Sequence, residues 1–249
     1  MIFLLTDFGS AGPYVGQVIA AIARRAPDAR VIPLFNDLPA FRPDLAAYLL
    51  PAYSINQSEG AVFLCVVDPG VGGERRAVAV EADGRWYVGP DNGLFSIVAR
   101  RADNSIWWDI GGAATPDFAT FHGRDLFAPV AASLALGLPP DGECVEPSAL
   151  GAEGPDDLFR IVYVDHYGNL MTGIRASALG VGDQLALSGH TFVHARTFSD
   201  VPAGSGFWYE NANGLVEIAV NSGSARDLCH AEPGDHVRLI DGGALLRNE

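Results

Sequence analysis

Apolar residues form short runs along the first part of this chain, and polar or glycine-rich turns separate the runs. Runs bounded by turn residues, which are typical of buried strands, lie at 2–6, 31–35, 63–67, 77–81, 86–88 and 106–109. Longer apolar-rich stretches, which predict helices, lie at 14–25, from about 43 onward with an interruption near Pro51, and at 126–136. Strands that alternate with helices indicate βαβ units, so we expect an N-terminal α/β domain with a central, mostly parallel sheet.

The pattern changes at 139–157, where PPDGECVEPSALGAEGPDD is rich in Pro, Gly and acidic residues and has no apolar period. We therefore predict a domain boundary, with an N-terminal domain at 1–150 and a C-terminal domain at 158–249. Beyond the boundary, short strand-like runs recur at 159–164, 184–187, 191–195, 207–209, 215–220 and 237–240. Because no amphipathic helix separates them, they predict a small β-barrel or sandwich.

The composition indicates a folded protein and excludes some classes of binding partner. Of the 249 residues, 49% are hydrophobic and 18% are charged, which is enough for a real core. The net charge is -14, and such a charge opposes binding to nucleic-acid phosphates and to anionic membranes. It mildly favours a cationic ligand, although solubility alone would also account for it. We expect no nucleic-acid partner and no membrane partner.

The cysteines indicate the cellular compartment. Cys65, Cys144 and Cys229 are far apart, with no CxxC pair and no histidine at metal-ligand spacing. We therefore expect free thiols in a reducing compartment and no metal centre. The first residues, MIFLLTDFG, form a short apolar run without preceding basic residues, so they predict neither a signal peptide nor a spanning helix. The expected location is the cytoplasm.

Two predicted strands end on carboxylates. The strand at 63–67 is followed by Asp68 and a glycine-rich turn, and the strand at 2–6 is followed by Asp7. Ligands of open α/β sheets bind outside the carboxyl ends of the strands, so we expect both carboxylates at one candidate site. For Asp68 the alternative is a tight turn with an exposed carboxylate. Asp7 suits the hydroxyls of a ribose, and its alternative is a helix N-cap.

Two loops add further candidates. TFHGRD at 120–125 carries His122, which is either catalytic or a hydrogen-bonded loop histidine, and Arg124, which we expect in a structural ion pair. DHYGN at 165–169 fits a binding loop or a simple hairpin turn. Phosphate-binding motifs are missing: there is no GxxxxGK[ST], and Arg75 stands where the dinucleotide fingerprint requires its third glycine.

Taken in order, these clusters resemble a known family. The motifs TDFG, VVDPGVGGERR, VGPDNGL, TFHGRD, VDHYGN and NANGLVEIAVN, which span 6–221, resemble the S-adenosyl-L-methionine (SAM) hydrolases (adenosine-forming). This family is also called the SAM hydroxide adenosyltransferases and is related to fluorinase and chlorinase. The resemblance implies an α/β domain followed by a smaller β-barrel domain. It also implies a homotrimer whose ligand sits between one subunit's first domain and its neighbour's second.

The implied reaction is in-line attack of water or hydroxide on the ribose 5′ carbon of SAM, which gives adenosine and L-methionine without a cofactor. The family's water-activating Asp, Arg and His correspond to Asp68, Arg75 and His122. Either Asp68 or His122 could take the proton if a neighbouring cation such as Arg75 tunes its pKa.

The resemblance also assigns substrate-binding positions. Asp7 corresponds to the carboxylate that holds the ribose hydroxyls, and Asn169 to the residue that reads the adenine edge. Glu217 lies among apolar residues of a predicted strand, where a carboxylate needs a partner. The full set of substrate-binding positions is Asp7, Phe41, Asp68, Tyr167, Asn169, Phe198, Ala212, Glu217 and Val220, in which Phe41 lies beside the nucleoside and Tyr167 and Phe198 sandwich the base.

Two positions depart from the family pattern. Gly12 replaces an acidic residue of the first loop, and Ala212 replaces a serine. Both positions bear on the methionine half of the ligand or its surroundings. Two other functions therefore stay open beside hydrolysis. One is transfer of a halide such as chloride, against which the intact Asp, Arg and His argue. The other is non-catalytic binding of adenosine or SAM.

Overall fold

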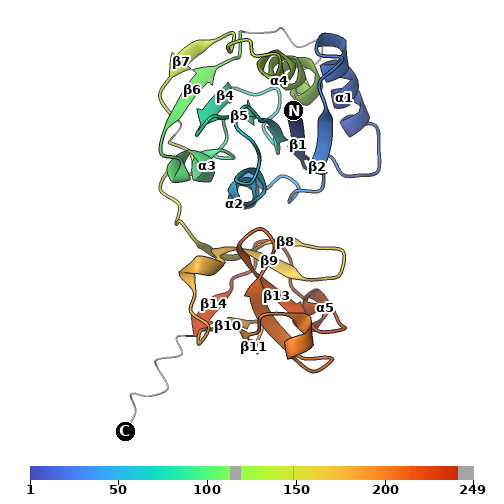
Figure 1. Ribbon diagram of the computed structural model, residues 1–249, viewed down its shortest axis with the longest axis vertical. Coiled ribbons are helices and arrows are strands. Elements are labelled where there is room, and N and C mark those ends of the chain that lie inside the picture. Colours follow the sequence, from blue (N-terminus) through green and yellow to red (C-terminus); the bar gives the residue numbers. More distant parts are fainter. Residues whose placement is uncertain (113–118, 148, 241–249) are drawn as a thin grey trace. The chain divides into compact units, whose positions relative to one another are not determined.

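The computed structural model describes residues 1–112, 119–147 and 149–240. The chain forms two compact units, Met1–Gly154 and Pro155–Glu249 (Figure 1). The division between them falls within the Pro- and Gly-rich stretch 139–157. Three pieces of the predicted domains lie outside the described residues, namely 113–118, 148 and 241–249.

The first unit is built on a seven-stranded sheet. Its strands, in spatial order, are β2 (Val31–Phe35), β1 (Ile2–Thr6), β3 (Val62–Val66), β5 (Arg85–Pro90), β4 (Ala77–Ala82), β6 (Ser105–Asp109) and β7 (Glu143–Val145). In this spatial order, neighbouring strands from β2 through β1 and β3 to β5 pair in parallel. Neighbouring strands from β5 through β4 and β6 to β7 pair antiparallel. β1 and β3 are continuous apolar runs because both of their faces are buried. The expected α/β class is confirmed.

Helices cover both faces of this sheet (Figure 1). α1 (Tyr14–Arg25) and α4 (Ala128–Ala135) pack together on one face, where Val18, Ile22 and Val130 share a core with Leu4 and Leu64. α2 (Pro43–Ser54) and α3 (Ser96–Arg101) cover the other face.

The helix α2 corrects one expectation, because it continues through Pro51 to Ser54 instead of being interrupted. A proline inside a helix costs about 3 kcal/mol, since it removes a backbone hydrogen bond and crowds the preceding turn. Leu45, Leu49 and Leu50 of the same helix are buried. Each buried leucine contributes about 1.5–3 kcal/mol. Burial of the helix therefore outweighs the local cost of the proline.

The second unit is a curled sheet of seven strands. In spatial order they are β14 (Arg238–Ile240), β10 (Gln184–Leu187), β11 (His190–His194), β12 (Gly206–Glu210), β13 (Leu215–Val220), β9 (Leu170–Arg175) and β8 (Leu158–Val164). The backbone N–H of Ile161 in β8 donates to the backbone carbonyl of Asp235 at 2.9 Å, and the N–H of Val237 donates to the backbone carbonyl of Phe159 at 3.0 Å. The segment before β14 thus returns to β8 and curls the sheet into a partial barrel, as expected. A short helix, α5 (Ala225–Cys229), accompanies it.

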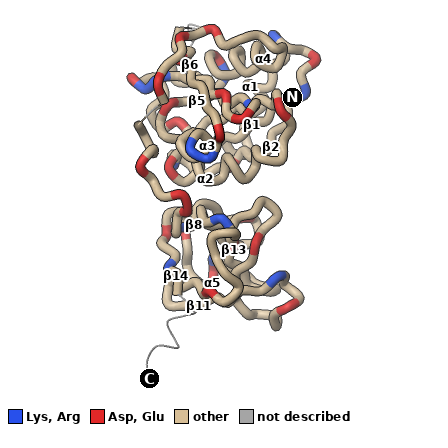
Figure 2. The backbone as a smooth tube through the Cα atoms, turned by 60° about the vertical axis from the view of Figure 1, so that its left-hand side comes forward, with Lys and Arg blue, Asp and Glu red and all other residues tan. Residues whose placement is uncertain are grey.

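Acidic residues occur along the backbone of both units, and the basic residues marked in the same view are all arginines (Figure 2). The three cysteines are unpaired, with Cys65 and Cys229 buried and Cys144 exposed. Among the described residues, no helix combines the length and the apolar character that a membrane crossing requires.

Candidate active site

The carboxyl ends of β1 and β3 bring two carboxylates together. These strands are paired in parallel, with Thr6 opposite Val66, so the residues that follow them lie at the same edge. The backbone N–H of Asp7 donates to the carbonyl of Val66 at 3.2 Å, and Asp68 lies two residues beyond Val66. Burial raises the pKa of Asp7 above its ordinary value, and the charge of Asp68 adds to the rise. Asp7 and Asp68 therefore interact electrostatically.

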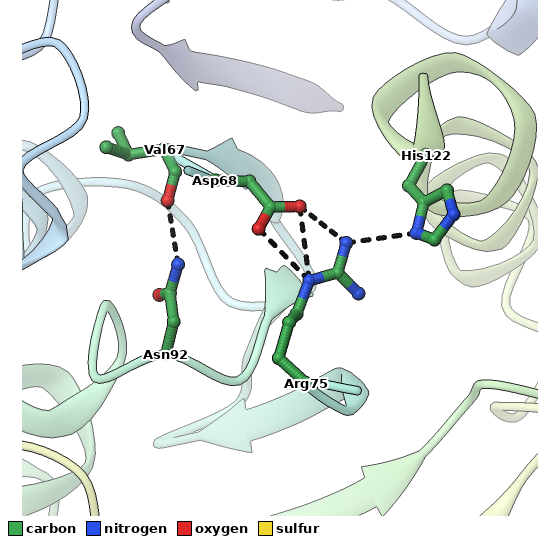
Figure 3. A network of polar contacts seen from close by, with 5 residues as sticks. All are labelled: Val67, Asp68, Arg75, Asn92 and His122. Atoms are coloured by element: carbon green, nitrogen blue, oxygen red, sulfur yellow. Dashed lines mark hydrogen bonds and ion pairs between the residues drawn. The ribbon is translucent and has the colours of Figure 1, made fainter. Parts of the chain in front are cut away.

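Asp68, Arg75 and His122 form one polar network (Figure 3). Arg75 Nε lies 3.1 Å from both carboxylate oxygens of Asp68, and Arg75 Nη2 lies 2.5 Å from Oδ2. The same Nη2 lies 3.0 Å from Nδ1 of His122. The side chains of Asp68 and Arg75 are 4% and 11% exposed, so the ion pair is largely withdrawn from water. Residues distant in sequence are thus held in one fixed arrangement.

The contact with Arg75 defines the protonation state of His122. A guanidinium only donates hydrogen bonds, so Nδ1 of His122 accepts, and the ring is neutral with its proton on Nε2. Burial lowers the pKa of His122, and the positive charge of Arg75 lowers it further, against the opposing charges of Asp68 and Asp125. The neutral ring presents a donor at Nε2.

A π-helical turn, Gly123–Phe127, begins directly after His122 and leads into α4. A π turn inserts an extra residue into a helix and is frequent at functional sites. Gly123 packs closely against Phe8, because a Cβ at this position would lie 3.0 Å from the tip of the Phe8 ring. The expected ion pair of Arg124 is present, since its Nε lies 2.5 Å from Asp125 Oδ1.

The loop between Asp68 and Arg75 has a conformation that depends on glycine. Gly72 adopts a φ of 78°, and a Cβ there would lie 2.9 Å from the carbonyl oxygen of Ala119. The loop therefore packs tightly against the segment that leads to His122. A cavity of about 410 Å³ beside the loop is lined by Arg75 and His122, among other residues.

A second cavity of the first unit, of about 670 Å³, is lined by Asp7 and by the rings of Phe8, Tyr14, Phe41 and Phe121, among other residues. This volume lies within the usual range for small-molecule sites, about 300–1,000 Å³. The backbone N–H of Phe41 donates to Asp7 Oδ2 at 3.1 Å, and Phe41 adopts a φ of 60°. Phe41 as a whole residue is 72% exposed. The carboxylate of Asp7 thus holds an exposed aromatic residue at the cavity.

In the second unit, Asp165 organises the turn that carries Tyr167 and Asn169. Its Oδ1 accepts from the backbone N–H groups of Tyr167 and Asn169, each at 2.8 Å, and its Oδ2 accepts from Asn169 Nδ2 at 2.9 Å. Gly168 supplies the left-handed φ of 82° that the turn requires. Asn169 is buried, whereas Tyr167 is 75% exposed. The segment is a hairpin turn, and it also presents an aromatic ring to solvent.

Glu217 has the partners that its position demands. Its Oε1 accepts from the hydroxyl of Tyr209 at 2.5 Å, and its Oε2 accepts from Asn211 Nδ2 at 2.9 Å. Burial raises the pKa of Glu217, and these two hydrogen bonds oppose the rise. Tyr209 in turn lies edge-on to Phe198, with 5.4 Å between ring centroids.

The remaining predicted positions of the second unit lie close in sequence to this cluster. Asn211 Oδ1 accepts from the backbone N–H groups of Asn213 and Leu215, which shapes the loop that carries Ala212. Val220 ends β13 and is buried. Sequence reasoning missed Tyr209 and Asn211, although Asn211 opens the turn NANG, a signal that could have marked it as a loop-forming side chain.

The fold and the site together define a two-domain α/β protein with a polar strand-end site and a separate partial barrel. Family models for the SAM hydroxide adenosyltransferase N-terminal and C-terminal domains match residues 2–142 and 159–238. The chain therefore belongs to the SAM hydroxide adenosyltransferase family.

Individual relatives agree with this membership. An (R)-S-adenosyl-L-methionine hydrolase of Thermus thermophilus is 43% identical over 260 residues, which covers 96% of this chain and 99% of the relative. A protein of the same name from Salinispora arenicola is 38% identical over 261 residues, covering 95% and 96%. The crystal structure of an uncharacterized conserved protein from Thermotoga maritima superposes with a TM-score of 0.85 at 30% identity, covering 96% of this chain and 99% of that one.

Proposed function

We propose that this protein is an enzyme that hydrolyses S-adenosyl-L-methionine to adenosine and L-methionine. In the reaction an oxygen–carbon bond forms at the ribose 5′ carbon, the sulfur–carbon bond breaks, and one water proton is released. The observation that best supports the proposal is the buried network of Asp68, Arg75 and His122 in a member of this family. No cofactor is needed, because the sulfonium already activates the carbon.

In the proposed mechanism, Arg75 holds Asp68 and His122 in fixed orientations around the attacking water. We assign proton removal to Asp68, because Arg75 donates to His122 Nδ1 and leaves Nε2–H only as a donor. His122 then orients the water oxygen. Methionine leaves as a neutral thioether, so its departure requires no general acid. Opposite charges on hydroxide and sulfonium cancel along the reaction, which a dry site favours.

We further propose that the substrate contacts follow the family. Asp7 binds the ribose hydroxyls, and Phe41 lies beside the nucleoside. Tyr167 and Phe198 sandwich the adenine, whose edge Asn169 reads. The exposed rings of Phe41 and Tyr167 support these roles, because large exposed aromatic faces suit stacking on a base. The nucleoside end is lined by Ala212, Glu217 and Val220.

Following the family resemblance, we also propose a homotrimer in the cytoplasm, with each substrate between the first unit of one subunit and the second unit of its neighbour. A complementation experiment tests this assembly. Asp68→Ala and Asn169→Ala subunits are each expected to be inactive, and mixing them after dissociation should restore activity in sites that combine two intact halves. Light scattering should give the mass of three chains, and a monomeric enzyme with full activity would contradict the assembly.

Product analysis tests the reaction itself. The pure protein with SAM should release equal amounts of adenosine and methionine, and in ¹⁸O water the label should enter the 5′-hydroxyl of adenosine. Asp68→Ala and His122→Ala should lower turnover by about 10²–10⁴-fold, as loss of a general base or its partner does. The exposed His190→Ala serves as the matched control.

Three other outcomes would contradict hydrolysis. Absence of adenosine from the wild type at high enzyme concentration would overturn it. Tight binding of SAM without turnover would identify a binding protein. Formation of 5′-chloro-5′-deoxyadenosine from chloride would identify a halide transferase.

A further inference from the structure

The segment VGPDNG at 88–93 forms the end of β5 and the turn after it, and it lies beside the strand that delivers Asp68. β5 is the parallel neighbour of β3, with Val88 opposite Leu64. A Cβ on Gly89 would lie 2.1 Å from the carbonyl oxygen of Cys65, so only glycine allows the two strands to approach this closely. The turn after β5 is therefore held at the same edge of the sheet as the candidate site.

Asn92 contacts the backbone that leads to Asp68. Its Nδ2 donates to the carbonyl of Val67 at 2.9 Å, and Val67 directly precedes Asp68 (Figure 3). The preceding carbonyl, of Val66, accepts from the backbone N–H of Asp7. Both carbonyls at the exit of β3 are thus fixed, and the direction in which the chain presents the Asp68 carboxylate is fixed with them.

Asp91 performs the corresponding task at the other end of the loop. Its backbone N–H donates to the carbonyl of Arg76 at 3.0 Å, and its Oδ2 accepts from Arg76 Nε at 2.8 Å. The carboxylate is 4% exposed. Because Arg76 directly follows Arg75, Asp91 fixes the backbone from which the Arg75 side chain extends.

We propose that Asp91 and Asn92 are positioning residues for the hydrolysis, with Asn92 setting Asp68 and Asp91 setting Arg75. The inference rests on the proposed function. The loop from 69 to 74 contains no helix or strand, and the turn at 91–92 contacts the backbone on both sides of it, at Val67 and at Arg76. In-line displacement depends strongly on alignment, and a misplacement of about 1 Å can cost about 100-fold in rate. Adjacent residues of one turn thus hold both members of the Asp68–Arg75 pair.

The test compares Asn92→Ala, Asn92→Asp and Asp91→Asn with Asn104→Ala, which changes an exposed asparagine of another loop. Asn92→Asp preserves the side-chain shape but removes the donor and sets a carboxylate against the Val67 carbonyl. Asp91→Asn preserves shape but removes the charge that pairs with Arg76. We expect kcat to fall by about 10- to 100-fold in the three site variants, as for a small misalignment.

The affinity for adenosine separates positioning from general loss of structure. Neither residue is among the predicted binding positions, so the Kd for adenosine and the KM for SAM should stay at the wild-type values while kcat falls. Unfolding temperatures are measured on the same samples. If Asn92→Ala does not fold, the two variants that preserve shape carry the comparison.

The failures of the two proposals are distinguishable. A wild type that forms no adenosine overturns the hydrolase and this inference together. An active wild type with site variants whose kcat matches that of Asn104→Ala overturns only the positioning roles. A parallel loss of adenosine affinity and kcat would also overturn them, since it would indicate a purely structural contribution.

Discussion

Removing one partner of the Asp68–Arg75 pair should destabilise the protein much more than removing both. Asp68→Ala leaves the guanidinium of Arg75, only 11% exposed, without its carboxylate. An uncompensated buried charge costs about 3–5 kcal/mol, whereas replacing both members of a buried pair by apolar residues is often neutral. In a protein of this size about 1 kcal/mol lowers the unfolding temperature by 2–4 °C, so Asp68→Ala should lower it by about 6–20 °C.

The double variant Asp68→Ala/Arg75→Met should recover most of that loss, because it removes the stranded charge and leaves an apolar side chain against Phe127. Thermal unfolding at one protein concentration and one pH measures both changes. Adenosine formation is assayed in parallel and should be lost in the single and the double variant alike. Recovery of stability without recovery of activity would show that the pair serves the reaction rather than the fold.

The exposed pair Arg42–Asp44 provides the control, because its side chains are 39% and 58% exposed. A surface ion pair contributes about 0–1 kcal/mol, so Asp44→Ala should lower the unfolding temperature by less than about 4 °C. The reasoning is refuted if Asp68→Ala behaves like Asp44→Ala. It is equally refuted if the double variant loses as much stability as the two single variants added together.

Three further outcomes are expected. Because burial and the Arg75 charge lower the pKa of His122, the unfolded chain takes up this proton at a higher pH than the folded chain. The free energy of unfolding should therefore fall as the pH drops below about 6.5. The value of kcat/KM should fall only at lower pH, where His122 of the folded protein is protonated. Unfolding and adenosine formation measured over a series of pH values check both expectations. Glu217→Gln keeps an acceptor for Tyr209 but turns an amide toward the Asn211 donor, so it should cost about 1–3 kcal/mol of unfolding free energy and raise the KM for SAM. Ala212→Ser restores the family residue at a position proposed to line the nucleoside end, so it should lower both the KM for SAM and the Kd for adenosine, as steady-state kinetics and calorimetry would show.

The strands and the edge of the sheet could be predicted because they depend on local patterns. Apolar runs in the sequence predicted β1 and β3. Because parallel strands end at the same edge of a sheet, the sequence also predicted that Asp7 and Asp68 lie at one edge. Helix α3 spans only Ser96–Arg101, too short for a helical period to be distinct. Helix α2 continues through Pro51 because its leucines are buried, and the local rule for proline takes no account of burial.

The partners within the sites could not be predicted in the same way. The sequence indicated that a carboxylate at Glu217 needs a partner, but Tyr209 is chosen by the strand register that pairs it with Glu217. Asn92 reaches Val67 across 25 positions of the chain, through the neighbouring strands β3 and β5. Contacts of this kind follow from register and sheet order, which are tertiary properties.

The charge balance of the site explains why such contacts should matter for the rate. The charges of Asp68 and Arg75 neutralise one another, and His122 is neutral, so the network carries little net charge. The charges of the reacting hydroxide and sulfonium cancel as well, so net electrostatic attraction from the network contributes little. In a displacement of that kind, a large part of the available rate gain comes from holding the nucleophile in line with the leaving sulfur. Alignment depends on the backbone beneath the side chains as much as on the side chains themselves. The turn that holds Val67 and Arg76 should therefore influence turnover without touching the substrate, whereas changes at Phe41 or Tyr167 should act on binding.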